Sequence, residues 1–138
     1  MRVEVSKVID RPIADVFHWY ADEHVRNHPR WNPGLELWLD SDAPIGVGTI
    51  IRRRHSMWGN PIEGTMEVME FEPNRAMGAV IHDGPVEMRG RATFEAIGAD
   101  QTNLAISAEF PESINASLMR SGMERSLENI KNLIEDEL

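Results

Sequence analysis

The pattern that most restricts how this chain can fold is an apolar stripe near its C-terminal end. Between residues 113 and 138, apolar side chains recur at steps of four, four, three, four and four, the period of one helical face; they are Met119, Met123, Leu127, Ile130, Ile134 and Leu138. A helix of about 25 residues is roughly 37 Å long. Such a helix needs a long apolar surface to cover its stripe, and the face of a sheet supplies one.

Short strands are predicted before this helix. Residues 2–9 alternate apolar and polar side chains, as in a strand with one buried face, and further strands are predicted at residues 35–39, 48–56, 62–71, 75–82, 86–97 and 102–110. Gly, Pro, Asn and Asp mark turns between them, for example at residues 58–61 and 83–85. Because the connections are short, neighbouring strands should pair antiparallel.

The segment between the first two strands is predicted to be helical and then irregular. Apolar residues at helical spacing indicate a short amphipathic helix over residues 13–20, and residues 22–28 are compatible with a second one. Pro29 and Pro33 are expected to end it, because proline disfavours helix in the residues before it.

One strand, two short helices, six strands and a long terminal helix make an α+β chain. We expect a curved antiparallel sheet of about seven strands wrapped around the C-terminal helix, in a single domain spanning residues 1–138. Where the sheet does not close fully on the helix, the space between them becomes an elongated cavity. A chain of 138 residues is long enough to form a core with a cavity in it.

Composition excludes several classes of function. The chain carries 23 acidic and 14 basic residues, and its net charge of −9 repels nucleic-acid phosphates and anionic membranes. It contains no cysteine, which rules out disulfides, thiol catalysis and thiolate metal sites. No apolar run approaches the roughly 18 residues of a membrane span. We therefore expect a cytoplasmic protein, a monomer or weak homodimer, with no nucleic-acid partner, membrane insertion, metal or cofactor.

Short motifs along the chain resemble those of a known superfamily. They are Ile9-Asp10-Arg11-Pro12 followed by Val16-Phe17, Asp22 with Trp31-Asn32-Pro33, Gly46-Val47-Gly48-Thr49, Gly64-Thr65-Met66-Glu67-Val68 and Phe71-Glu72-Pro73-Asn74-Arg75. In this order the whole chain resembles the START-like helix-grip superfamily (SRPBCC), which includes polyketide cyclases and dehydrases and lipid-transfer domains. The resemblance implies this fold and an internal cavity. It implies no particular reaction, because the superfamily has no universal catalytic set and many members only bind an apolar ligand.

The apolar faces of the predicted strands and helix supply candidate cavity residues. Eight methionines are many for this length, and thioethers adapt to irregular apolar ligands, although ordinary core filling is the alternative for each. Gly122 lies in the middle of the predicted helix. It is explained by a bend, by a need for space beside the cavity, or by chance. The predicted ligand-binding residues are Trp31, Trp38, Ile51, Arg53, His55, Met66, Val68, Met77, Met88, Phe94, Met119, Gly122 and Met123.

Two tryptophans lie in the broken stretch before the second strand. Large aromatic side chains are rarely left in a loop with nothing to cover. We place Trp31 at one mouth of the cavity, where it would close over a ligand. Trp38 belongs to the second strand, where it would cover either ligand or core.

The strand at residues 48–56 contains three consecutive arginines and a histidine. Alternation sends Arg52 and Arg54 to one face and Arg53 and His55 to the other. Glutamates on the outer face of the next strand can pair with Arg52 and Arg54, so by elimination Arg53 and His55 face the cavity. A buried guanidinium then needs a ligand carboxylate or enolate, or an acid of the pocket. The alternative is a strand near the sheet edge with all three arginines in solvent.

Histidines suggest acid–base chemistry or a metal site. His55 and His82 lie on strands that can border the pocket and are, with Arg53, the candidates for catalysis. His24 and His28 have the spacing of many zinc ligands, but we expect a solvated loop there and no metal, because Pro29 should end the helix. No phosphate-binding loop, serine nucleophile motif or catalytic carboxylate pair is evident in the sequence.

Three functions fit these patterns. The leading hypothesis is binding of a small hydrophobic molecule, such as a lipid, an aromatic compound or a polyketide-like chain, with Arg53 or His55 as a polar anchor. The second is a polyketide cyclase or dehydrase acting in the same cavity, where a His or Arg assists enolisation and loss of water. The third is a protein-interaction or regulatory module with a filled interior.

Overall fold

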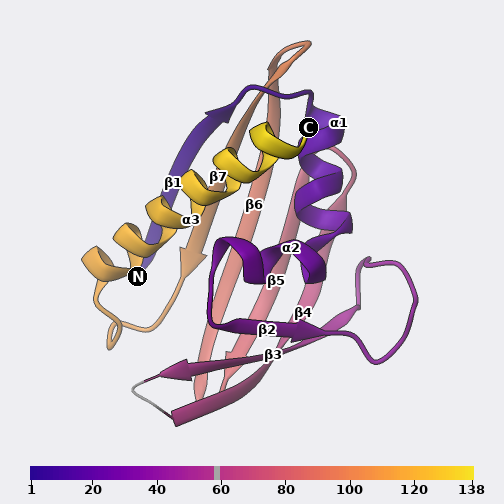
Figure 1. Cartoon of the computed structure of the whole chain (residues 1–138). Helices are drawn as coiled ribbons and strands as arrows, with labels where there is room; N and C mark the ends of the chain where they lie inside the picture. Colours follow the sequence, from indigo (N-terminus) through magenta and orange to yellow (C-terminus); the bar gives the residue numbers. More distant parts are fainter. Residues whose placement is uncertain (58–59) are drawn as a thin grey trace.

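The computed structural model describes residues 1–57 and 60–138 (Figure 1). Its elements are β1 (Arg2–Ile9), α1 (Ile13–Phe17), a π-helical segment η1 (His18–Asp22), α2 (His24–Trp31), β2 (Leu35–Trp38), β3 (Ile50–Met57), β4 (Asn60–Glu72), β5 (Ala76–Asp83), β6 (Val86–Gly98), β7 (Gln101–Glu109) and α3 (Ala116–Glu137). The predicted turn at residues 58–61 falls partly on residues 58–59, outside those described, and Asn60 and Pro61 belong to β4.

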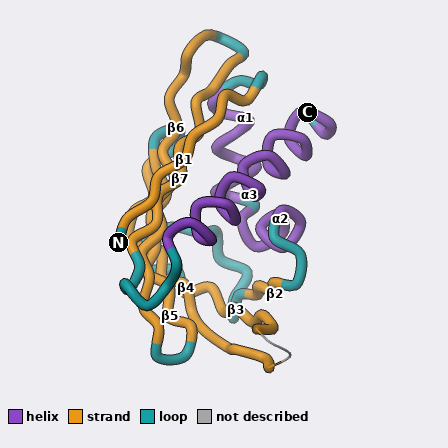
Figure 2. Tube along the Cα trace, turned by 90° about the vertical axis from the view of Figure 1, so that its left-hand side faces the viewer, coloured by secondary structure: helices purple, strands orange, loops and turns teal. Residues whose placement is uncertain are grey.

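All the strands form one antiparallel sheet in the order β1-β7-β6-β5-β4-β3-β2. Shifts of register between Val68 and Glu70 in β4, and between Ala96 and Gly98 in β6, bend these strands, because a bulge adds local twist. The helices all lie on one side of the sheet (Figure 2). This confirms the predicted helix-grip α+β architecture.

Helix α3 lies over the edge strand β1 and is fixed to it by polar contacts (Figures 1 and 2). Lys131 Nζ donates to the carbonyl oxygen of Val8 at 2.9 Å, and the Glu135 carboxylate accepts from the Asp10 backbone N–H at 2.9 Å. Of the predicted apolar stripe, Leu127, Ile130 and Ile134 are buried, Met119 and Met123 are half-buried, and Leu138 is exposed. The C-terminal half of α3 therefore packs tightly, whereas its N-terminal half borders open space.

The prediction that Pro29 ends the second helix is wrong. α2 continues through Pro29 to Trp31, and its last turn is closed by the Asn32 backbone N–H donating to the carbonyl oxygen of His28 at 3.0 Å. Proline removes only one backbone donor from a helix this short, so packing outweighs its cost. None of the helices within residues 1–57 and 60–138 is long and apolar enough to cross a membrane.

Candidate functional site

A cavity in two adjoining compartments lies between the sheet and the helices. The aromatic compartment, named for Tyr20, His24, His28 and Trp31 in its wall, has a volume of about 210 Å³. The loop compartment, lined by residues 32–35 after α2 and residues 83–86 around the β5–β6 turn, has a volume of about 600 Å³. The two adjoin because they share three lining residues, Arg53, Met88 and Met119.

Short side chains keep the aromatic compartment open. Ala79, Gly90 and Ala108 are paired partners in one row across β5, β6 and β7. All three line this compartment. A methyl group added at Gly90 would meet only Ile81 Cδ1, at an ordinary contact distance of 3.8 Å. Because interiors are normally close-packed, a row of small residues facing open space is what leaves the cavity unfilled.

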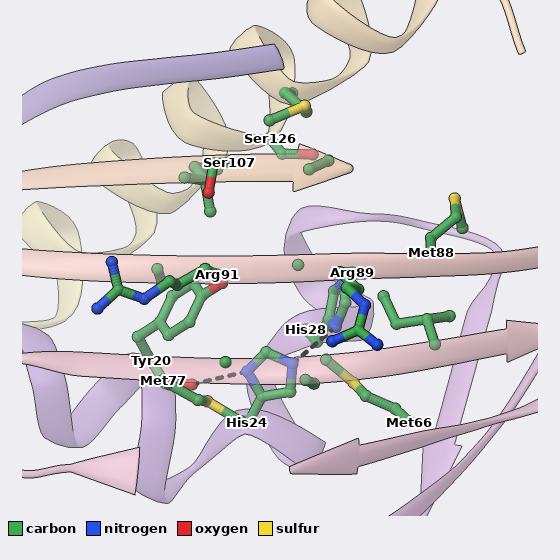
Figure 3. A pocket seen from close by; sticks show the side chains of 18 of the residues that line it. Tyr20, His24, His28, Met66, Met77, Met88, Arg89, Arg91, Ser107 and Ser126 are labelled. Atoms are coloured by element: carbon green, nitrogen blue, oxygen red, sulfur yellow. Dashed lines mark hydrogen bonds between the residues drawn. The ribbon is translucent and has the colours of Figure 1, made fainter. Parts of the chain in front are cut away.

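Flexible apolar side chains surround this space. Five methionines from β4, β5, β6 and α3 line the aromatic compartment: Met66, Met77, Met88, Met119 and Met123. In Figure 3, the labelled side chains of Met66 and Met77 lie on either side of the His24 ring. Arg91, drawn nearby, belongs to the other face of the sheet, because its Nε donates to Glu70 Oε1 there at 2.7 Å. The wall therefore adapts to ligand shape and carries few charges.

The strand β3 has the phase inferred from the sequence. Arg53 is only 8% exposed and lines both compartments, whereas Arg52 and Arg54 are exposed. The solvent partner of Arg52 is Asp40, whose Oδ2 lies 2.8 Å from Nε, in place of the expected glutamate. His55 is half-buried and lines the loop compartment.

The partner of Arg53 is Asp83, which lies two strands away. In the register, Gly64 on β4 pairs with Arg53 on one side and with Asp83 on the other. A Cβ at Gly64 would come within 2.0 Å of the His82 carbonyl oxygen and 2.5 Å of Asp83 Oδ1. Only glycine fits there, and its missing side chain lets the guanidinium reach across β4 to the carboxylate.

The charged cluster is compact and buried. Arg53 Nε and Asp83 Oδ1 lie 3.0 Å apart, with both side chains 9% exposed, and His55 Nε2 lies 3.2 Å from Asp83 Oδ2. The Nε–H bond is not aimed at Oδ1, so the pair is held by charge without an aligned hydrogen bond. Burial lowers the pKa of Arg53, and the neighbouring Asp83 opposes that shift.

A pair of histidines forms the opposite wall of the aromatic compartment. His24 Nδ1 lies 2.9 Å from the Tyr20 carbonyl oxygen, and His24 Nε2 lies 2.9 Å from His28 Nδ1 (Figure 3). Burial lowers the pKa of His24 to about 4, against the effect of its bond to Tyr20 and with help from the charge of Arg53. Burial, His24 and Arg53 likewise hold the pKa of His28 well below its usual value. Both rings are therefore neutral at pH 7.

Trp31 organises this wall. It is the last residue of α2, only 4% exposed, and its ring stacks on Tyr20 at 5.0 Å and 14° and on His28 at 4.6 Å and 20°. The Asn129 side-chain amide of α3 donates to its carbonyl oxygen at 3.1 Å. Trp31 is therefore a fixed part of the cavity wall as well as a candidate for contact with a ligand.

The structure brings eight of the predicted ligand-binding residues to the two compartments: Trp31, Arg53, His55, Met66, Met77, Met88, Met119 and Met123. Ile51, Val68 and Phe94 are buried in the core beside them. Two lie elsewhere: Trp38 is 38% exposed on the edge strand β2, and Gly122 lines a surface groove between α2 and α3. His82 is exposed on the other face of the sheet, 3.9 Å from Glu87.

Sequence reasoning missed several residues of this site. The sequence places Tyr20 only within the amphipathic helix predicted over residues 13–20, and Asp83 only within the turn predicted at residues 83–85. The expectation of a solvated loop at His24 and His28 is wrong, because α2 holds both against the cavity. The available signal was their spacing of four residues, which places two side chains on one helical face.

Comparisons with known proteins agree with this fold. Residues 1–135 match the model of the family described as polyketide cyclase / dehydrase and lipid transport. A search of curated proteins found no match. Similar solved structures include protein CV1439 from Chromobacterium violaceum (19% identity, 97% of this chain and 96% of that chain covered, TM-score 0.79) and a START superfamily protein from Mycobacterium smegmatis (14%, 99% and 99%, 0.78).

A third similar structure is the Zhui aromatase/cyclase from Streptomyces sp. R1128, with 16% identity, 99% of this chain and 92% of that chain covered, and a TM-score of 0.74. At these identities the structural likenesses establish the fold alone. The family match extends over nearly the whole chain and therefore establishes the family as well as the fold. This chain belongs to the polyketide cyclase / dehydrase and lipid transport family.

Proposed function

We propose that this protein binds a small, largely hydrophobic molecule, such as a lipid, an aromatic compound or a polyketide-like chain, between the sheet and α3. The observation that carries the proposal is the cavity, whose loop compartment of about 600 Å³ has the size of typical small-molecule sites. At about 25 cal/mol per Å² of apolar surface, a ligand burying about 300 Å² gains about 7 kcal/mol before the costs of association. Burial of the ligand's apolar surface is the driving force for binding.

Few polar groups are available to orient the ligand. Arg53 is shared by both compartments, and the histidine pair faces the aromatic compartment. A few polar groups in an apolar wall favour an amphipathic ligand, with its apolar body against the methionines and a polar substituent near Arg53 or His28. This arrangement supports ligand binding over the hypothesis of an interaction module with a filled interior.

The proposed site is tested by filling part of the aromatic compartment with a larger side chain on β6. We expect Gly90→Leu to project four side-chain carbons toward the ligand, at a position where the added Cβ meets only Ile81. At about 0.8 kcal/mol per buried CH₂, displacing equivalent ligand contacts weakens binding by about 3 kcal/mol, or about 150-fold. Gly98→Leu is the matched control, because Gly98 ends the same strand and a Cβ there meets nothing within 4 Å.

The assay is a fluorescence titration with 1-naphthol, together with native mass spectrometry of gently isolated protein for a retained hydrophobe. Weakened binding in Gly90→Leu alone supports the proposed site. Equal naphthol affinity in both glycine variants and the wild-type protein would contradict it.

A second candidate function is proton transfer in the same cavity, as in a cyclase or dehydrase. The observation that favours it is a neutral histidine pair and a guanidinium in one apolar compartment. His28 would take a proton from a carbon between two carbonyl groups, and Arg53 would stabilise the enolate oxygen that forms. The protonated His28 would exchange its proton with solvent and return one to the carbon, which restores the neutral histidine and the diketone. Accelerated deuterium exchange of a bound 1,3-diketone, lost in His28→Phe with binding retained, would support this function; exchange at the uncatalysed rate would refute it.

A further inference from the structure

We propose that the histidine pair selects ligands bearing a hydrogen-bond donor, such as a hydroxyl group, because its hydrogen bonds fix His28 as an acceptor. The inference rests on the proposed function and specifies which ligands the cavity prefers. It concerns His24 and His28 of the aromatic compartment, which have no part in the charged cluster of Arg53 and Asp83.

The Tyr20 carbonyl oxygen sets the direction of both hydrogen bonds, the one between Tyr20 and His24 and the one between His24 and His28. A carbonyl oxygen only accepts, so His24 must carry its proton on Nδ1 to bind the Tyr20 carbonyl, 2.9 Å away. A neutral imidazole then has an unprotonated Nε2. His24 Nε2 therefore accepts from His28 Nδ1, also 2.9 Å away, and this fixes the proton of His28 on Nδ1. The remaining ring nitrogen, His28 Nε2, is left as a lone-pair acceptor.

The surroundings hold both rings in this state. Burial and the nearby Arg53 disfavour protonation of either histidine, so the acceptor is retained at neutral pH. The opposite tautomer of His28 would place two ring lone pairs against each other. Trp31 stacks on the His28 ring at 4.6 Å, and Tyr20 meets the His24 ring edge-on at 5.2 Å, which limits reorientation of both rings.

A fixed acceptor in an apolar wall favours ligands that carry a hydrogen-bond donor, because a ligand without a donor leaves the acceptor unpaired. A ligand hydroxyl can donate to His28 Nε2, whereas the corresponding methyl ether has the same aromatic body but no proton to donate. His28 is only half-buried in the free protein, so its Nε2 is covered when a ligand binds. A site arranged to hydrogen-bond one group disfavours an analogue without it, because the analogue covers this polar atom and gives it no partner. We expect at least a tenfold difference in affinity between two such ligands.

The experiment compares 1-naphthol with 1-methoxynaphthalene by calorimetric titration of the intact protein. The wild-type protein should bind 1-naphthol at least tenfold more tightly. The ratio should fall to about threefold or less in His28→Phe, which keeps an aromatic ring against Trp31 and removes the acceptor. It should be unchanged in His18→Phe, because His18 is an exposed histidine of η1 outside the cavity wall.

Nitrogen NMR of histidine-labelled protein provides a readout that loss of packing would not mimic. In the free protein, the spectra should show His24 and His28 protonated on Nδ1 and unprotonated on Nε2. Addition of 1-naphthol should shift the His28 Nε2 resonance, and 1-methoxynaphthalene should shift it much less.

The outcomes separate this inference from the proposed function. Equal affinity for both naphthalenes would overturn the donor preference while leaving ligand binding intact. A proton on His28 Nε2 in the free protein would overturn it independently of any ligand. If neither naphthalene bound, the proposed function and this inference would both be contradicted.

Discussion

Replacing Asp83 by Asn should lower the free energy of unfolding by about 3 kcal/mol or more. Asp83 and Arg53 are each 9% exposed on the side chain, and their Nε and Oδ1 atoms lie 3.0 Å apart. Removing one member of a buried pair leaves an uncompensated charge, which typically costs about 3–5 kcal/mol. We expect the lower end of this range, because the guanidinium borders two cavity compartments where water can reach part of it.

A double-mutant cycle measures the coupling within the pair. Arg53→Met removes the charge at nearly constant length, and the combination of Arg53→Met with Asp83→Leu should regain most of the stability lost by either single change. Urea unfolding of the wild-type protein, both single variants and the double variant gives the four free energies required.

The matched control is Asp40→Asn, which breaks an exposed pair of similar geometry, with Asp40 Oδ2 at 2.8 Å from Arg52 Nε. It should cost less than about 1 kcal/mol. If Asp83→Asn cost no more than Asp40→Asn, and the double variant regained nothing, the assignment of Arg53 and Asp83 as a coupled buried pair would be refuted.

Three further predictions address the supports of the site. Gly64→Ala should lower the free energy of unfolding by at least about 2 kcal/mol, because its Cβ would lie 2.0 Å from the His82 carbonyl oxygen. Urea unfolding of this variant and of the control Gly98→Ala checks the prediction, and equal stability of the two variants would contradict it. Stability should decrease as the pH is lowered from about 6.5 to 4, because the unfolded chain protonates His24 and His28 in this window before the folded one does. The part due to His24, up to about 3 kcal/mol, should be absent in His24→Asn when unfolding is measured at pH 7 and 4.5, and an undiminished loss would disprove the assignment. Asn115→Ala should cost about 1 kcal/mol in thermal unfolding, because the Asn115 side chain caps α3 by accepting from the Leu118 backbone N–H; an unchanged melting temperature would count against that role.

The fold was predictable because its signals are local and repeated. Alternation of apolar residues predicted the strands, and the stripe from Met119 onward predicted α3 with nearly its observed bounds. The phase of β3 did not follow from the sequence alone. Alternation separated Arg53 from Arg52 and Arg54 but left open a strand with all three in solvent, and the structure shows Arg53 buried.

The site depended on pairings that no short stretch of sequence contains. Asp83 becomes the partner of Arg53 only through the register of three strands, with Gly64 between them. Trp38 was a candidate as a large aromatic residue, but it belongs to an edge strand and remains partly exposed. The role of His28 required the helix to continue through Pro29, which tertiary packing decides and local propensity disfavours.

The most direct test of the central claim is a methionine-methyl NMR titration with 1-naphthol. Five methionines line the aromatic compartment, whereas Met1 and Met69 are exposed and serve as internal controls. Binding in the cavity predicts that the methyl signals of Met66, Met77, Met88, Met119 and Met123 shift together with one dissociation constant, while those of Met1 and Met69 stay in place. Unchanged signals from the five lining residues, or shifts confined to Met1 and Met69, would contradict a ligand site between the sheet and α3.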